Sequence, residues 1–370
     1  MASRLLAQLA SRIAAARDPV EAACLRAQRG IYLARQGKYE HAQATVDAIR
    51  SEFGARPDAQ VTAWVSLVEA LIHFYSQPGP RARDRLQRAQ VLSRAMNHPV
   101  LVPLCAAWLA HVEFNDNRMQ PMLQQVREAL QRAQPDHHAA LARVSLVVAD
   151  ALHFAGRFDL AKPWYAKVRE HALAEGDDAM ISAMLHNVAA LRTNQVRLAD
   201  AFGESLHAEG GRAFMELEST ANYDTGIGTL SLGSFLPLLR AQLLVSQGRF
   251  AEAVPLFSGT LDHERLENLA RREACFFADR AWCHLKLGEP ALALSDVERA
   301  CALDDVPADL DDMASTHARI SAVLSGLNQP ERAAVHQQSA TELLRKHVQS
   351  QAVLLQQLQE ALAGERGLAR

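Results

Sequence analysis

The residue types that perform most enzymatic chemistry are present in this chain, but their spacing fits no catalytic or metal site. Fifteen histidines and five cysteines occur among 370 residues. The sequence has no His-Glu-x-x-His motif, no Cys-x-x-Cys pair and no other His/Cys cluster at metal-ligand spacing. A Gly-x-Ser-x-Gly nucleophile elbow and the protein-kinase signatures are also missing. We therefore predict that the protein is not an enzyme and that it uses no metal and no cofactor.

One glycine-rich stretch, Gly226-x-Gly228 followed by Ser231, has the composition of a phosphate cradle. A phosphate-binding loop follows a β-strand and places Lys-Ser or Lys-Thr at the start of the next helix. Neither feature surrounds this stretch, so we interpret it as a loop. The aspartates Asp311 and Asp312 come just before an expected helix start. We interpret them as capping residues, because carboxylates stabilise the N-terminal end of a helix dipole.

The elements that must position the remaining polar residues repeat along the chain. Each copy has a short helix-breaking step, an aromatic or aliphatic residue and then a small residue, as in Gly37-Lys38-Tyr39 before Ala42. The copies begin at residues 37, 77, 117, 156, 196, 248, 288 and 328, and the first and last of these intervals are 40 residues long. The interval between 196 and 248 is the long exception. Such a period indicates stacked pairs of helices that bury their apolar faces only against their neighbours.

Small residues recur where the two helices of each pair are expected to cross, because a small side chain lets the helix axes approach to roughly 8 Å. On the first helices, seven positions before the turn, they are Gly30, Ala110, Ala149, Ala189, Ala241 and Ala281. On the second helices, five positions after the start of the turn, they are Ala42, Ala161, Ala201, Ala253, Ala293 and Ala333.

This arrangement resembles the tetratricopeptide repeat (TPR). The copies that carry the resemblance are Gly30/Gly37/Tyr39/Ala42, Ala149/Gly156/Phe158/Ala161, Ala241/Gly248/Phe250/Ala253 and Ala281/Gly288/Pro290/Ala293. The period of 40 is longer than the usual ~34 of the family and is similar to that of bacterial regulatory arrays that accompany diguanylate cyclase domains. The resemblance implies an all-α, right-handed TPR-like α-solenoid of about eight helix-turn-helix repeats, which ends in a long C-terminal helix.

The repeats and their exceptions divide the chain into five segments. We expect an N-terminal capping helix (1–18), repeats 1–5 (19–205), an irregular insert with a Gly-rich loop (206–233), repeats 6–8 (234–345) and a C-terminal helix extension and tail (346–370). No helix breaker occurs between Pro330 and Gly364, which predicts about 34 helical residues, or about 50 Å. The heptad-like positions Leu344, Val348, Leu355, Leu358 and Leu362 leave two interpretations open: a cap over the last repeat, or a dimerisation or signalling helix.

In TPR proteins the first helix of each pair lines the concave groove, so the resemblance also implies a set of peptide-binding residues. They are Trp108, His111, Asn115, Arg143, Asp150, His153, His186, Asn187, Asn194 and Gln242. Asn187 lies where peptide-binding members of the family carry an amide that pairs with the peptide backbone. The alternative is that its amide only bonds to the neighbouring helix. Arg143 is the only basic groove residue in this stretch, so the family's carboxylate clamp is not supported.

Composition limits the partners and the compartment. The net charge of −3 and the pI near 6.6 argue against nucleic acid as a partner, and no apolar run approaches the length of a membrane span. The odd number of cysteines fits a reducing, cytoplasmic location. Residues 1–17 carry arginines and no acid, so they resemble a transit peptide, although a helix packed on the array is the alternative. We predict a scaffold that binds a protein or peptide on its concave face. The alternative is a sensory module that binds a peptide or small molecule and signals through its C-terminal helix to an output domain or partner.

Overall fold

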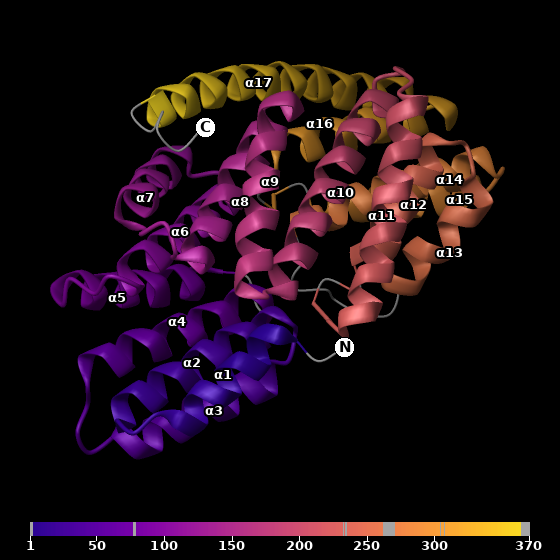
Figure 1. Cartoon of the computed structure of the whole chain (residues 1–370). Coiled ribbons are helices and arrows are strands. Elements are labelled where there is room, and N and C mark those ends of the chain that lie inside the picture. Colours follow the sequence, from indigo (N-terminus) through magenta and orange to yellow (C-terminus); the bar gives the residue numbers. More distant parts are fainter. Residues whose placement is uncertain are drawn as a thin grey trace. The chain divides into compact units, whose positions relative to one another are not determined.

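The computed structural model describes residues 3–76, 79–231, 233, 235–261, 271–303, 305–306 and 308–363. Over these ranges the chain forms seventeen α-helices and no strand (Figure 1), which confirms the predicted all-α class. In chain order they are α1 (Arg4–Ala15), α2 (Pro19–Arg35), α3 (Tyr39–Phe53), α4 (Ala59–Ser76), α5 (Pro80–Ala95), α6 (Leu101–Asn115), α7 (Met119–Arg132), α8 (His138–Phe154), α9 (Phe158–Glu175), α10 (Asp178–Ala201), α11 (His207–Ile227), α12 (Phe235–Ser246), α13 (Phe250–Leu261), α14 (Glu273–Lys286), α15 (Pro290–Cys301), α16 (Leu310–Gly326) and α17 (Pro330–Ala363).

The chain forms two compact units. Unit 1 contains residues 1–184, 223–231 and 353–370, and unit 2 contains residues 185–222 and 232–352. Within unit 1, α2 packs on α3 and α4, α4 packs on α5, and α6 packs on α7 and α8. Within unit 2, α12 packs on α13 and α14, and α14 packs on α15 and α16. In these pairs the first helix contacts its own partner and the next first helix, which is the packing of a helical-repeat solenoid.

The turns inside the helix pairs have the geometry that the repeat pattern predicts. Gly37, Gly156, Gly248 and Gly288 adopt φ values between +73° and +79°, and Asn117 and Asn328 adopt +57° and +58°. This left-handed conformation ends an α-helix, and glycine and asparagine tolerate it best. Six of the eight predicted turns are therefore confirmed. The predicted turn at Gln77 lies outside the described residues.

The predicted turn at residue 196 is wrong. Helix α10 continues through Val196, Arg197 and Leu198 and ends only at Ala201. None of the three residues favours a left-handed backbone, and Arg197 is held inside unit 2 by two carboxylates that are described below. Ala201, which was expected at a helix crossing, is instead the last residue of α10 and is half-buried. The following segment contains the 21-residue helix α11, and Gly226 lies in its last turn.

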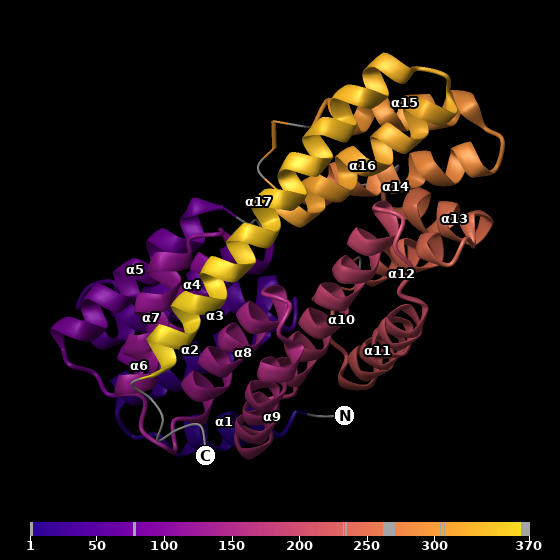
Figure 2. The same cartoon turned by 90° about the horizontal axis from the view of Figure 1, so that it is seen from above.

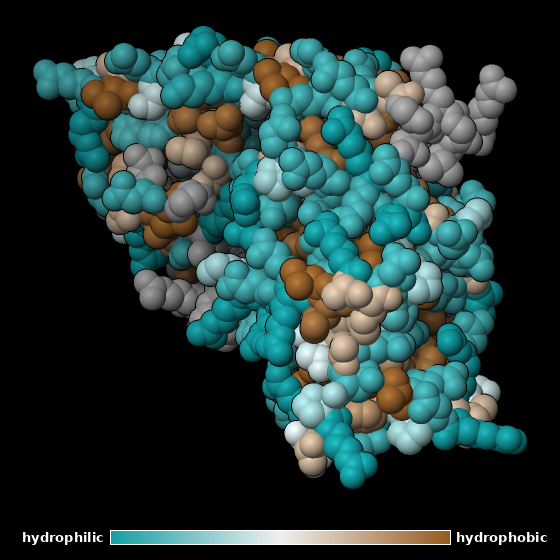
Figure 3. Space-filling model, turned by 90° about the vertical axis from the view of Figure 1, so that its left-hand side faces the viewer, coloured by the Kyte–Doolittle hydropathy of each residue, from teal (hydrophilic) through white to brown (hydrophobic). Residues whose placement is uncertain are grey.

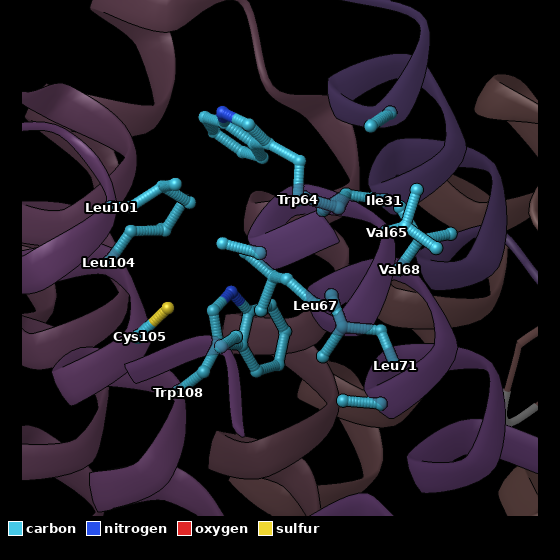
Figure 4. Packing of buried hydrophobic residues seen from close by; sticks show 14 of the residues in the cluster. Ile31, Trp64, Val65, Leu67, Val68, Leu71, Leu101, Leu104, Cys105 and Trp108 are labelled. Atoms are coloured by element: carbon cyan, nitrogen blue, oxygen red, sulfur yellow. The ribbon is translucent and has the colours of Figure 1, made fainter. Parts of the chain in front are cut away.

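Small residues lie at the helix crossings, and large apolar residues fill the space around them. Ala110, Ala149, Ala189, Ala241 and Ala281 are fully buried. At Gly30, an added Cβ would lie 3.2 Å from a methyl group of Val68, so even alanine would be tight there. Four of the partner alanines, at 42, 161, 253 and 293, are also fully buried. In unit 1 the core is centred on α2, α4 and α6, where Trp64, Leu67, Leu71 and Trp108 pack together (Figure 4).

Helix α17 spans 34 residues without a break, as the sequence predicts (Figure 2). Its predicted apolar seam is only partly correct, because Leu358 is fully buried but Val348 is 57% exposed. The residues that are buried along the helix are Ala340, His347, Leu354, Leu358 and Ala361. Because this seam is buried within the chain itself, the homodimer suggested by the heptad pattern has no support in the structure.

On the face shown in Figure 3, hydrophilic side chains predominate and the apolar ones form only small groups. Among the helices listed above, none combines the length and the apolar character needed to cross a membrane.

All five cysteines have free thiols, and four of them are buried. Burial raises the pKa of Cys24, Cys105 and Cys275 to about 12, so these thiols stay protonated and unreactive.

Candidate binding site

Unit 1 contains a cavity of about 350 Å³ that is partly open to solvent. Side chains of α1, α2, α4, α6 and α8 line it, together with the turn between α9 and α10. The apolar lining includes Leu9, Ile31, Trp64, Leu104 and Trp108. The polar and charged lining consists of Arg12, Gln28, Tyr32, Arg35, Gln134, Asp136, His137, His138, Glu175 and Asp177. A cavity of this size, with an apolar wall and a few polar groups, has the character of a ligand pocket.

A second cavity of about 200 Å³ shares several of these residues. Arg12, Gln28, Trp64 and Val100 line both cavities. The second cavity continues along α2 past Glu21 and Cys24. Because the two cavities share these residues, they are neighbouring parts of one hollow along α2. This hollow is longer than a single amino-acid side chain.

Trp108 is the residue around which the site is built. It is 2% exposed, and its ring lines the larger cavity. The guanidinium carbon of Arg143 lies 3.8 Å from the centroid of the ring, and that of Arg35 lies 5.9 Å from it. These distances are those of cation–π contacts, in which the negative face of an aromatic ring attracts a cation. Helices α2, α6 and α8 thus bring two buried arginines to one indole.

The two arginines differ in their partners. Nη1 of Arg35 donates to Oδ2 of Asp177 at 2.6 Å, and both side chains are buried. Burial alone lowers the pKa of Arg35, but the Asp177 carboxylate outweighs it and leaves the pKa above its ordinary value. Among the described residues, no carboxylate forms an ion pair with Arg143, and its Nε and Nη2 have no hydrogen-bond partner. Burial lowers the pKa of Arg143 to about 10, so it still carries its charge at neutral pH.

His111 completes the aromatic surroundings of Trp108. Its ring centroid lies 5.9 Å from that of Trp108 and 5.2 Å from that of Phe74. Burial, followed by the nearby cations Arg143 and Arg35, lowers the pKa of His111 well below its ordinary value. A neutral imidazole is the consequence, and its Nδ1 has no hydrogen-bond partner. His111 does not line either cavity, so it supports Trp108 from within the core.

The predicted groove residues Asp150 and His153 belong to a buried polar chain on α8 and α9. The hydroxyl of Tyr165 donates to Oδ1 of Asp150 at 2.9 Å. Nδ1 of His153 lies 3.2 Å from the same hydroxyl oxygen. Because Tyr165 comes from the second helix of the pair, this chain ties α8 to α9. Its main role is therefore structural.

Unit 2 contains a denser network of buried charges. Arg197 donates to Asp279 at 2.9 Å and to Asp312 at 2.5 Å. Arg319 forms ion pairs with Asp279 and Asp200. Arg272 lies 3.1 Å from the second oxygen of Asp312. This network links α10, α14 and α16.

Two predicted groove residues join the edge of that network. Gln242 donates to Oδ2 of Asp279 at 3.0 Å, and its amide lies 3.6 Å from the sulfur of Cys275. Asn194 accepts a hydrogen bond from Arg272. His186 and the half-buried Asn187 lie on α10, and Asn115 is exposed at the end of α6. The ten predicted residues therefore fall into two groups, with six in unit 1 and four in unit 2.

Sequence reasoning missed Arg35, Asp177 and the whole cavity that they line. Arg35 and Asp177 are 142 residues apart, and neither is among the predicted groove residues. A weak signal was available for Arg35, which lies five residues after Gly30, the same spacing that separates the predicted residues Asn115 and Asn194 from Ala110 and Ala189. The capping interpretation of Asp311 and Asp312 is also incomplete. Both lie in the first turn of α16, but they are buried, and Asp312 pairs with Arg197.

Asp311 is the most strongly perturbed carboxyl group of this network. Burial and the neighbouring Asp312 carboxylate raise the pKa of Asp311 to about 7. The pKa of Asp312 moves the other way, because Arg272 and Arg197 outweigh its burial. In the part of the chain that the structure describes, no three His, Cys, Asp or Glu side chains converge in a way that could hold a metal ion.

Solved structures with a similar fold are known. No protein-family model matches the chain, and no curated protein matches it either. A structural match is found to the protein of the "Crystal Structure of Rap Protein Complexed with Competence and Sporulation Factor", with a TM-score of 0.57 and 11% sequence identity. The match covers 89% of this chain and 99% of that chain, and it gives no link to diguanylate cyclases. The likeness extends over nearly all of both proteins and identifies the fold as a helical-repeat solenoid of the Rap kind.

Proposed function

We propose that this chain is a non-enzymatic, peptide-binding helical-repeat protein and that unit 1 holds the ligand. The observation that carries the proposal is the cavity of about 350 Å³ at Trp64 and Trp108. Its walls combine apolar surface for side chains with hydrogen-bonding groups for a peptide backbone, among them Tyr32 and Gln28. A peptide needs both kinds of surface, because its buried amides lose their water and must find new partners.

The charges of the cavity favour a polypeptide over a nucleic acid. Arg12 and Arg35 face it, but so do Asp136, Glu175 and Asp177. A nucleic acid would meet repulsion from three carboxylates, and its phosphates require clustered Lys and Arg instead. A peptide can present charges of both signs, which suits a lining of mixed charge.

The structural comparison supports the same class of function. The similar protein of known structure is complexed with Competence and Sporulation Factor, so this solenoid architecture can hold a bound factor. The shared fold alone does not define a site. For this reason the proposal rests on the cavity, and the comparison is supporting evidence.

A capture experiment with a cavity-filling variant tests the proposal. Immobilised protein is incubated with a random peptide pool, and bound peptides are identified by mass spectrometry. Gln28 lines both cavities and is half-buried, so Gln28→Trp should fill the hollow without opening the core. Gln87→Trp makes the same change at an exposed position of α5 and is the matched control. We expect the wild type and Gln87→Trp to capture peptides and Gln28→Trp to capture few. Equal capture by all three, or by none, would contradict the proposal.

A regulatory role is the second candidate, and one observation favours it. Helix α17 is unbroken over 34 residues, with residues 330–352 in unit 2 and residues from 353 onward in unit 1. A rigid element shared by two units can transmit a change in one of them to the other. The test is hydrogen exchange along α17 with and without a captured peptide. If peptide binding changes the protection of residues 330–352, the regulatory role is supported. If the protection is unchanged, only the role of a binding scaffold is left.

A further inference from the structure

Two histidines hold the backbone of Val100, a residue that lines both cavities of unit 1. Nδ1 of His98 accepts hydrogen bonds from the backbone amides of Val100 and Leu101, each at 3.2 Å. Nε2 of His137 donates to the carbonyl oxygen of Val100 at 2.8 Å. His98 itself lines the smaller cavity, and His137 lines the larger one. The two imidazole rings therefore fix a part of the cavity wall to which they also belong.

His137 also holds the start of the next first helix. Its Nδ1 accepts a hydrogen bond from the backbone amide of Ala140 at 3.3 Å, which caps α8. Because Nδ1 accepts, the single hydrogen of the neutral ring is on Nε2, where the bond to Val100 needs it. One neutral imidazole thus joins the start of α8 to the start of α6.

Protonation takes away what these rings supply. An imidazolium has two N–H donors and no acceptor, so it cannot accept from the amides of Val100, Leu101 or Ala140. It also adds a positive charge at the N-terminal end of a helix, which the helix dipole disfavours. The three backbone amides are therefore held only while the rings are neutral.

His98 shows the sign of the effect. Burial lowers its pKa, and the nearby His137 lowers it further. The folded state then binds fewer protons at His98 than the unfolded state does. The stability that His98 contributes is therefore complete above its ordinary pKa of about 6.5 and is lost as the pH falls below that value.

The charged groups around His98 do not reverse this sign. Arg12, Asp18 and Glu21 line the same cavity, and so does Cys24, whose thiol is neutral. The two carboxylates favour a protonated ring and Arg12 opposes it. The lowered pKa of His98 shows that burial outweighs the carboxylates.

The groups around His137 act in both directions. The other charged or titratable residues of the larger cavity are Arg12, Tyr32, Arg35, Asp136, His138, Glu175 and Asp177. Burial, followed by Asp177, raises the pKa of Glu175, so this carboxyl group takes up a proton more readily in the folded state and opposes the loss of stability. Nδ1 of His138 lies 3.1 Å from Nδ1 of His171 on α9, so protonation of both rings would break a further hydrogen bond of this wall.

We propose that His98 and His137 form a pH-sensitive switch of the binding site, which fixes the cavity wall at Val100 at neutral pH and releases it under mildly acidic conditions, so that a bound peptide dissociates. The paired bonds to one backbone unit make the two rings act on the same point of the wall. This inference rests on the proposed function of the cavity and adds the regulation of that site.

Hydrogen exchange of the free protein tests the switch without a ligand. The amides of Val100, Leu101 and Ala140 are compared at pH 7.5 and pH 5.5, after correction for the intrinsic exchange rates. We expect their protection to fall about tenfold at pH 5.5, which is about the effect of losing one helix cap. Amides within α12, in unit 2, are the internal reference and should keep their protection.

The double variant His98→Asn/His137→Asn assigns the effect to these two residues. Asparagine keeps an oxygen that can cap a helix and does not titrate, so protection at the three amides should become independent of pH, whatever its absolute level. His41→Asn changes an exposed histidine of α3 and should behave like the wild type. The exchange data of the wild type still decide the matter if circular dichroism shows that the double variant does not fold.

Binding at the two pH values then connects the switch to the site. The probe is a pool of N-acetylated random pentapeptides without His, Asp or Glu, because such peptides do not titrate between pH 5.5 and pH 7.5. The wild type and His41→Asn should bind the pool about tenfold more weakly at pH 5.5, and the double variant should bind it equally at both values.

The outcomes separate the two proposals. If the wild type shows the same protection and the same binding at both pH values, the switch is wrong while peptide binding in the cavity stands. If the double variant keeps the pH dependence of the wild type, other groups cause it and the switch is also wrong. If the wild type binds no peptide at either pH, the proposed function fails and its regulation fails with it.

Discussion

The guanidinium carbon of Arg143 lies 3.8 Å from the centroid of the Trp108 ring, in the core of unit 1. The two residues come from first helices of neighbouring pairs, α8 and α6, so repeat packing alone brings them together. Among the described residues, this relationship leaves a buried charge in the core of unit 1 that only the aromatic face stabilises.

The first prediction concerns stability at this site. Arg143→Met should stabilise the free protein by about 1 kcal/mol, because it replaces an unpaired buried charge with an apolar side chain of similar length. Arg35→Met should destabilise it by roughly 3–5 kcal/mol, because it leaves Asp177 buried without its partner. Urea unfolding monitored by circular dichroism measures both. The prediction is wrong if the two variants shift the midpoint in the same direction.

The second prediction concerns pH. The folded protein raises the pKa of Asp311 to about 7, from 3.8. Between these two values the folded state binds more protons than the unfolded state, so Asp311 should make the protein less stable as the pH rises. The shift corresponds to a loss of a few kcal/mol at most.

Asp311→Asn should remove this dependence, and it should therefore stabilise the protein at pH 8 more than at pH 5. Asp312→Asn is the contrasting variant. Because Asp312 forms ion pairs with Arg197 and Arg272, its removal should destabilise the protein at both pH values. Unfolding free energies at pH 5 and pH 8 decide the matter. An Asp311→Asn variant with the wild-type pH dependence would show that this carboxyl group does not titrate in the range.

The third prediction tests the packing of the repeats. Ala253 is fully buried on α13, so Ala253→Leu should overpack the helix crossing and destabilise the protein by roughly 1–3 kcal/mol. Ala251→Leu on the exposed face of the same helix is the matched control and should change little. Thermal unfolding compares the two variants. Equal melting temperatures would mean that Ala253 does not lie at a tight crossing.

The fourth prediction isolates a contact of the segment that follows α11. Gly37 and Gly156 have nearly the same φ, +78° and +74°. A Cβ at Gly37 would lie 2.9 Å from the backbone nitrogen of Ser231, whereas one at Gly156 would meet nothing within 4 Å. The hydroxyl of Ser231 donates to the carbonyl oxygen of Arg35 at 2.5 Å. The backbone amide of Leu230 donates to the carbonyl oxygen of Gln36 at 3.0 Å.

Gly156→Ala should therefore lower the free energy of unfolding by only about 1–2 kcal/mol, because of backbone strain. Gly37→Ala should lose more and should also expose the 229–231 segment to protease. The measurement is urea unfolding combined with limited proteolysis of both variants. Equal losses and equal cleavage would show that the segment does not dock on the turn after α2.

The sequence was most informative where local chemistry decides the structure. Gly37 and Asn328 predict their turns because few other residues adopt a left-handed backbone. The uninterrupted run after Pro330 predicts α17 because nothing in it breaks a helix. At Val196 the same reasoning failed, because the weak turn signal lacked a Gly or Asn and the buried ion pairs of Arg197 favour a continuous helix.

The candidate site was less accessible to sequence analysis. The register of the first helices placed Trp108, His111 and Arg143 on one face, and the structure does bring these three together. The partner relationships could not be predicted, because Arg35 meets Asp177 only through the packing of several helix pairs. The same limit applies to Asn187, whose groove role stays a prediction.

The affinity of one captured peptide for three variants is the most direct test of the central claim that the cavity of unit 1 is the binding site. Isothermal titration calorimetry would compare the wild type with Gln28→Trp, Gln87→Trp and Asn187→Ala, with circular dichroism as the folding control. The account predicts a loss of at least about tenfold for Gln28→Trp, or about 1.4 kcal/mol, and unchanged affinity for the other two. Unchanged binding by Gln28→Trp together with a similar loss in Asn187→Ala would contradict it and would place the site on α10 of unit 2.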